Sequence, residues 1–90
     1  MAQHRSAEKR ARQALKRRAR NRAVRSHVRG STRAVRAALE GGDVASAQTH
    51  LREAEKIIRR AASKGIVKKN TASRTVARLA RALHKAQQPA

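Results

Sequence analysis

The chain has 90 residues, a formal net charge of +19, no aromatic residue and no cysteine. This length allows at most one small domain, the lack of cysteine excludes disulfides and thiol-ligated zinc, and no apolar run is long enough to cross a membrane. Bulky apolar residues are few, so a core can hold helices together but cannot fill a thick globule. A compact protein with this charge repels itself, which indicates a polyanionic partner.

The charge is concentrated toward the two ends of the chain. Residues 1–39 carry 13 basic groups and one acid, residues 40–63 carry four of each, and residues 64–90 carry seven basic groups and no acid. A neutral middle between two basic parts suggests that two elements face the polyanion and one faces away. Arg outnumbers Lys by 17 to 7. That ratio suits bidentate phosphate binding, although a GC-rich genome would produce it as well.

Few breaks interrupt the helix-forming residues. Gly41-Gly42 and Lys64-Gly65 are the strong ones, and the only proline, Pro89, lies past the last helix. We predict helices at about residues 6–40, 44–63 and 71–86. Short connections favour antiparallel neighbours. The predicted fold is therefore an all-α, antiparallel, up-down-up three-helix bundle with an overlong basic first helix, forming a single domain over residues 1–90.

The first helix is predicted to begin at Ser6 as N-cap and to end with Gly41 at C′. Gly30 is a weak point where it could bend. Its second half carries an apolar stripe made of Val24, Val28, Val35 and Leu39. Its first half offers only alanines and Leu15 as apolar residues, so it cannot bury itself and should project from the bundle and be poorly ordered without a partner.

The second helix is predicted to start after the N-cap Asp43 and to end in a Schellman motif with Gly65 at C′ and Ile66 at C″. Its core face comprises Val44, Ala47, Leu51, Ala54, Ile58 and Ala61. The third helix begins near Asn70 or Thr71. It presents two nearly opposite stripes: an apolar one of Ala72, Val76, Leu79 and Leu83, and a basic one of Arg74, Arg78, Arg81 and Lys85.

Enzymatic chemistry has no support in this sequence. Glu40 and Asp43 flank a turn, where capping is the simpler role, and no two of the four histidines stand at helical metal-pair spacing. Gly41-Gly42 lacks the Lys-Ser/Thr that follows the glycines of a phosphate loop. We therefore expect no catalytic residue, no metal site, no cofactor and no small-molecule substrate.

Two basic stripes on the first helix are the strongest functional signal. One consists of Arg18, Arg22, Arg25, Arg29, Arg33 and Arg36, and the other of Arg5, Lys9, Arg12, Lys16 and Arg20. A helix that is basic on several sides can touch more than one phosphate backbone, with an affinity that falls steeply with salt. Base-stacking modules need aromatic platforms. Because the chain has no aromatic residue, it is expected to recognise the shape of a nucleic-acid backbone.

Several motifs resemble the bacterial small-subunit ribosomal protein S20 family, essentially end to end. They are Ser6-Ala7-Glu8-Lys9-Arg10, Lys16, Arg18, Asn21, Arg25-Ser26, Gly42-Asp43, Ala61-Ala62, Lys64-Gly65, Lys69-Asn70, Ala72, Arg74 and Arg78-Leu79. The resemblance implies a cytoplasmic, ribosome-bound protein that binds 16S rRNA directly, in the 5′ domain and neighbouring segments. It would bridge rRNA segments during assembly of the small ribosomal subunit.

Two positions depart from the family pattern. Lys68 stands where the family often has His, and Thr75-Val76-Ala77 replaces a more basic stretch. Stripes and motifs together predict the following RNA-binding residues: Arg5, Ser6, Lys9, Arg10, Arg12, Lys16, Arg17, Arg18, Asn21, Arg22, Arg25, Arg29, Lys64, Lys68, Lys69, Asn70, Arg74, Arg78 and Arg81.

Two alternative functions are compatible with the same high positive charge. A nucleoid-associated DNA-binding protein would be equally basic but would not predict Lys64-Gly65 and Lys69-Asn70 at these positions. A membrane-active cationic helix is compatible with the opposed faces of the third helix. The absence of Trp and Phe and the single leucine in the first 23 residues argue against it, and no membrane partner is expected.

Overall fold

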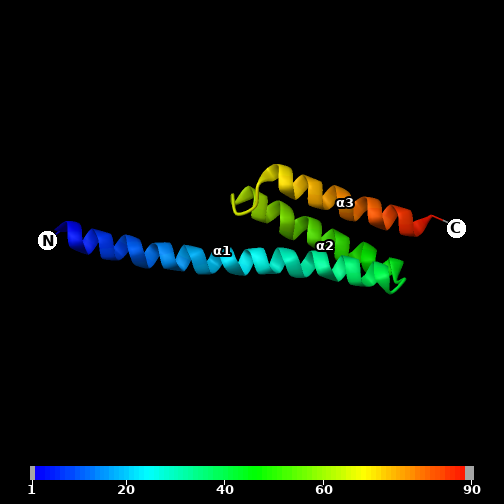
Figure 1. The fold of residues 1–90 in the computed structure, drawn as a ribbon, viewed down its shortest axis with the longest axis horizontal. Coiled ribbons are helices and arrows are strands. Elements are labelled where there is room, and N and C mark those ends of the chain that lie inside the picture. Colours follow the sequence, from blue (N-terminus) through cyan, green and yellow to red (C-terminus); the bar gives the residue numbers. More distant parts are fainter. Residues whose placement is uncertain (1, 89–90) are drawn as a thin grey trace.

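The computed structural model describes the backbone of residues 2–88 and the side chains of residues 4–88, so Pro89 lies outside the described residues. Over that range the chain forms α1 (Ala2–Glu40), α2 (Val44–Ser63) and α3 (Lys69–Gln87). Successive helices run antiparallel, and α1 and α3 both pack on α2 while touching each other less (Figure 1). The predicted all-α, up-down-up bundle is confirmed.

A thin core holds the three helices together. Its centre consists of Val35 from α1, Ala54 and Ile58 from α2, and Ala72 and Leu79 from α3. Alanine supplies two of these five positions, which lets the helix backbones approach closely. The apolar stripes predicted for all three helices are therefore the faces that pack, with their outer members half-buried.

The first part of α1 projects beyond the bundle, as predicted. The molecule measures 71 × 22 × 14 Å, and the N-terminal end of α1 extends past the connection between α2 and α3 (Figure 1). Every side chain described from residue 4 to residue 20 is exposed. We call residues 4–20 the arm. Its one large apolar side chain, Leu15, is 63% exposed, so the arm gains nothing from the core.

The turn between α1 and α2 differs by one residue from the prediction. Gly42, not Gly41, has the positive φ of a C′ residue, at 76°. Its N–H donates to the Leu39 carbonyl (3.1 Å), and the Asp43 N–H donates to the Ala38 carbonyl (2.9 Å), which is the Schellman pairing. Two adjacent glycines can each take the left-handed conformation, so the sequence did not determine which of them would do so.

Asp43 caps the start of α2, as predicted. Its carboxylate accepts hydrogen bonds from the Ser46 N–H (3.1 Å) and the Ser46 hydroxyl (2.7 Å). The hydroxyl bond, and then the backbone bond, hold the pKa of the Asp43 carboxyl below its usual value. The carboxylate thus satisfies one of the N–H groups that the first turn of a helix leaves free.

The connection from α2 to α3 has the predicted Schellman ending. Gly65 has φ 76°, its N–H donates to the Ala62 carbonyl (3.0 Å), and the Ile66 N–H donates to the Ala61 carbonyl (3.0 Å). Ile66 is half-buried. The turn after α2 is therefore fixed by backbone hydrogen bonds and anchored by an apolar side chain.

Two helix starts were predicted too late. α1 begins at Ala2, so Ser6 is a helix-interior residue and not an N-cap. No helix breaker precedes Ser6, and His4 pairs with Glu8 one turn later (3.1 Å). α3 begins at Lys69, with Lys68 as an N-cap that makes no side-chain hydrogen bond. α1 is also unbroken at Gly30.

Replacing Gly65 and Gly30 by alanine should change stability in opposite directions. Neither added Cβ would meet an atom within 4 Å, so only the backbone conformation decides. Gly65→Ala should cost about 1–2 kcal/mol, because a left-handed φ is unfavourable for alanine. Gly30→Ala should stabilise the protein by about 0.5–1 kcal/mol in a helix interior. Thermal melts followed by circular dichroism would measure the change in melting temperature for each variant. If both variants shifted the melting temperature in the same direction, the backbone conformation assigned to one of the two glycines would be wrong.

Candidate nucleic-acid interface

The basic side chains of this protein all lie on its surface. Each of the 24 Lys and Arg residues is exposed, and no polar or charged side chain is buried within the described residues. Long cationic side chains that stay in water are free to reach an external anion. All the positively charged side chains among the predicted RNA-binding residues are thus accessible to a partner.

Acidic side chains compensate little of this charge. Within residues 4–88 one Arg–carboxylate pair is present, in which the Arg59 Nε and one of its terminal nitrogens each lie 2.9 Å from Glu55 Oε1. Glu55 and Arg59 stand at i,i+4 in the order that favours such a pair on a helix. Of the other acids, Asp43 caps α2 and Glu8 contacts His4. Within the described residues, no Lys or Arg of the arm or of α3 is therefore part of an ion pair.

The arm presents cations in three directions. At 100° per residue, Arg10 and Arg17 fall on the same side of α1 as the buried Val35. The stripe that starts at Arg18 and the stripe that ends at Arg20 fall on the two other sides. A helix with cations all round it does not lie flat on one surface. It is suited to a position between anionic surfaces.

One hollow brings together predicted residues that are far apart in the sequence. It has a volume of about 600 Å³ and lies where the arm leaves the bundle, beside the connection between α2 and α3. Arg17 and Asn21 line it from α1 and Lys64 lines it from the end of α2. Arg20 also lines it, although it was not among the predicted binding residues. Arg20 belongs to the basic stripe that runs from Arg5 to Arg20, and this membership could have identified it as a binding residue from the sequence.

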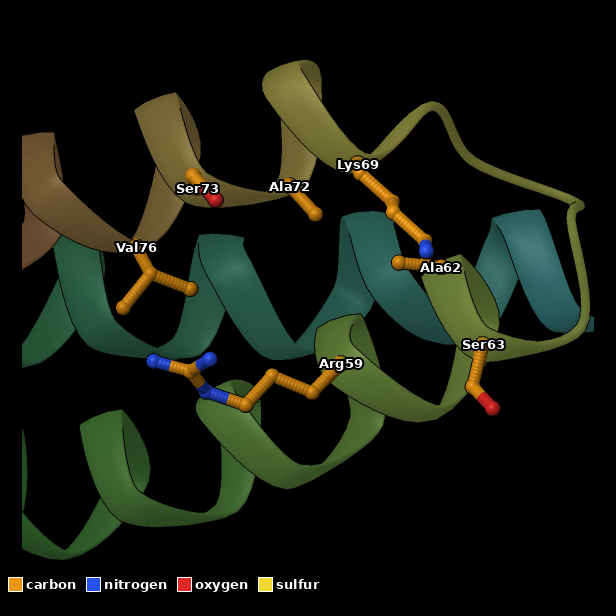
Figure 2. Close-up of a pocket in the computed structure, with 7 residues that line it drawn as sticks. All are labelled: Arg59, Ala62, Ser63, Lys69, Ala72, Ser73 and Val76. Atoms are coloured by element: carbon orange, nitrogen blue, oxygen red, sulfur yellow. The ribbon is translucent and has the colours of Figure 1, made fainter.

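A second hollow of about 400 Å³ lies between α2 and the start of α3. Figure 2 shows Lys69 reaching toward Ala62 of α2, while Arg59 lies along α2 below Val76. Because Arg59 is paired with Glu55, Lys69 is the cation of this hollow that has no carboxylate partner in the described structure. This hollow is therefore less cationic than the one beside the arm.

The structure does not bring the remaining predicted residues into either hollow. Arg74, Arg78 and Arg81 are exposed on α3, on the face opposite its buried Leu79, as predicted. Lys68 and Asn70 lie at the start of the same helix. The predicted residues thus form several separate cationic faces and not one continuous site.

Other kinds of site find no support in the described part of the chain. No group of three or more His, Asp or Glu side chains is placed to hold a metal ion. Within residues 2–88, none of the helices combines the length and the apolar character needed to span a membrane. Fold and surface together define a small, all-helical polycation whose charges face outward from an alanine-rich core.

Comparison with known proteins identifies the family. The sequence model described as Ribosomal protein S20 matches residues 2–84. A protein of Solidesulfovibrio magneticus is 53% identical over 87 residues, covering 97% of this chain and 98% of that one. One from Anaeromyxobacter sp. (strain K) is 53% identical and covers 94% and 93%. One from Helicobacter pylori (strain Shi470) is 53% identical and covers 88% and 89%. All three are named small ribosomal subunit protein bS20.

The chain belongs to the ribosomal protein S20 family. The resemblance drawn from the sequence motifs is therefore confirmed. Membership makes this protein a structural ribosomal component and not an enzyme, which agrees with the absence of catalytic motifs from the sequence.

Proposed function

We propose that this protein is a constituent of the small ribosomal subunit that binds 16S rRNA directly, in the 5′ domain and neighbouring segments, and bridges rRNA segments during assembly. It would then be cytoplasmic and ribosome-bound. The observation that carries the proposal is the set of exposed, uncompensated cations on the arm and on α3. The relatives' shared name, which places those proteins in the small subunit, supports it.

The charges would act mainly on phosphates. With no aromatic residue in the chain, bases cannot be stacked on ring platforms. Arg guanidinium groups fit phosphate oxygens in a planar fork. The arm can enter the space between two RNA helices because it has cations on every side. The Arg74, Arg78 and Arg81 face of α3 points away from the bundle and would contact a further backbone. Recognition would follow the shape of folded RNA.

The first test is binding to a folded transcript of the 16S rRNA 5′ domain, measured across a range of salt concentrations. Controls are an unrelated folded RNA of equal length and duplex DNA of equal charge. We expect affinity for all three to fall with salt, and the rRNA to keep a preference of roughly 10³-fold at physiological salt. Equal affinities that vanish together would overturn the proposal and favour a generic DNA-compacting polycation.

A further inference from the structure

The hollow beside the arm has an apolar floor and a cationic rim. Val24 of α1 and Ile66 of the α2–α3 connection line it as half-buried side chains, so both elements contribute apolar surface to its floor. Arg17, Arg20 and Lys64 line it as exposed side chains. None of the residues that line the hollow is acidic.

The two sides of the hollow are held by rigid backbone. Lys64 is the C-cap of α2, and its N–H donates to the Arg60 carbonyl (3.1 Å). The next two residues make the Schellman hydrogen bonds described above. Arg17 and Arg20 lie within the unbroken helix α1. Lys64 and Arg17 therefore both lie on ordered backbone, and little backbone order has to be gained when a ligand binds in the hollow.

Charge selects the class of ligand. Three like charges around one hollow repel one another in the free protein, by an amount that falls with distance and with the dielectric constant. An anion bound between the three cations offsets this repulsion. The hollow shown in Figure 2 offers no such arrangement, since Glu55 already neutralises Arg59. Asn21, which is half-buried and also lines the hollow beside the arm, adds an amide that can donate to an oxygen atom.

We propose that this hollow holds one phosphodiester of bound RNA, shared between Arg17 of α1 and Lys64 at the end of α2, with Arg20 at its rim and the Asn21 amide donating to the same group. The proposal rests on the proposed function and deepens it, because it assigns one phosphate to two elements of the fold. Because α1 is unbroken, a phosphate held this way sets the position of the RNA backbone relative to the cations farther along α1.

The test uses the salt dependence of binding to the 5′-domain transcript. Each neutralised phosphate contributes about 0.7–0.9 to the slope of log affinity against log salt. Two cations that share one phosphate can release the counter-ions of only one. We therefore expect the double variant Arg17→Ala, Lys64→Ala to lose about 0.7–0.9 from the wild-type slope. The matched control is Arg18→Ala, Lys64→Ala, which removes the same charge but whose Arg18 does not line the hollow. It should also lose about 0.7–0.9, but Arg18→Ala alone should already produce that whole loss, because Arg17 keeps the shared phosphate when Lys64 is removed.

The decisive single variant is Lys64→Ala, which should leave the slope nearly unchanged while lowering affinity, because Arg17 keeps the phosphate. Arg17→Ala alone should likewise leave the slope nearly unchanged, although the two substitutions together lose one phosphate. If each single variant instead lost about 0.7–0.9 and the double variant lost their sum, Arg17 and Lys64 would bind separate phosphates and the shared site would be overturned. That result leaves rRNA binding intact. A wild-type protein without rRNA preference would instead defeat the proposed function. Circular dichroism must show the same helix content in all variants, which is expected because all three side chains are exposed.

Discussion

Leu79→Asp is expected to unfold the bundle. Leu79 is 1% exposed and belongs to the core cluster, which contains residues of all three helices. The substitution removes roughly 2–3 kcal/mol of apolar burial and requires a carboxylate to be desolvated without a partner, which costs several kcal/mol more. A core this thin stabilises the folded state by too little to offset that loss. Circular dichroism at 222 nm should show loss of most helix at a temperature where the wild type is folded.

The matched control for this variant is Ala77→Asp. Ala77 lies on the same helix and is exposed, so the change introduces the same charge and costs only the difference in helix propensity, about 0.7 kcal/mol or less. Leu79→Ala should fall between the two, at about 2–5 kcal/mol. Equal melting of the two Asp variants would show that α3 does not pack through the face that contains Leu79.

Apolar periodicity made most of this fold predictable. Val35, Ile58 and Leu79 sit on stripes with helical spacing, and a helix can bury only one face in a small bundle. The structure buries these three side chains more completely than any other large ones. The end of α2 was also predictable, because Lys64-Gly65-Ile66 combines a glycine at C′ with an apolar residue at C″. Here local sequence and tertiary packing favour the same structure.

Helix starts were less predictable, for an identifiable reason. Every side chain of the arm is exposed, and the two that line a hollow with the α2–α3 connection, Arg17 and Arg20, lie at its bundle end. The tertiary structure therefore does not determine where α1 begins. Residues before Ser6 are all compatible with helix, and the helix extends to Ala2. Similarly, α3 begins at Lys69 without a side-chain cap, so the predicted start near Asn70 or Thr71 was too late by one or two positions.

The candidate interface was predictable as a set of residues but not as an arrangement. Charge and helical periodicity select the cations of α1 and α3 one helix at a time. They do not specify that Lys64 meets the same hollow as Arg17, because that depends on the length by which α1 overhangs the α2–α3 connection. The overhang follows from the packing register of α1 on α2, which small apolar side chains set through contacts distributed along both helices.

Charge reversal of Arg17 and Arg18 is expected to weaken rRNA binding severely without unfolding the protein. Both side chains are exposed on α1, and they face directions about 100° apart, so the double variant Arg17→Glu, Arg18→Glu affects two contacts. Each lost charged contact costs about 1.5–3 kcal/mol. Affinity for the 5′-domain transcript should therefore fall by roughly 10²–10⁴-fold, and the salt slope by about 1.4–1.8.

The control must change the net charge equally, because a weaker overall field also lowers affinity. Arg52→Glu together with Lys56→Glu does so. Both residues are exposed on α2, on the side opposite its buried Ala54, within the electrically neutral middle of the chain. If the two double variants weakened binding equally, the arm would contribute only to the long-range field and would make no local contact at Arg17 and Arg18. A much larger loss for the arm variant, with unchanged circular dichroism in both, would place those two side chains at the RNA.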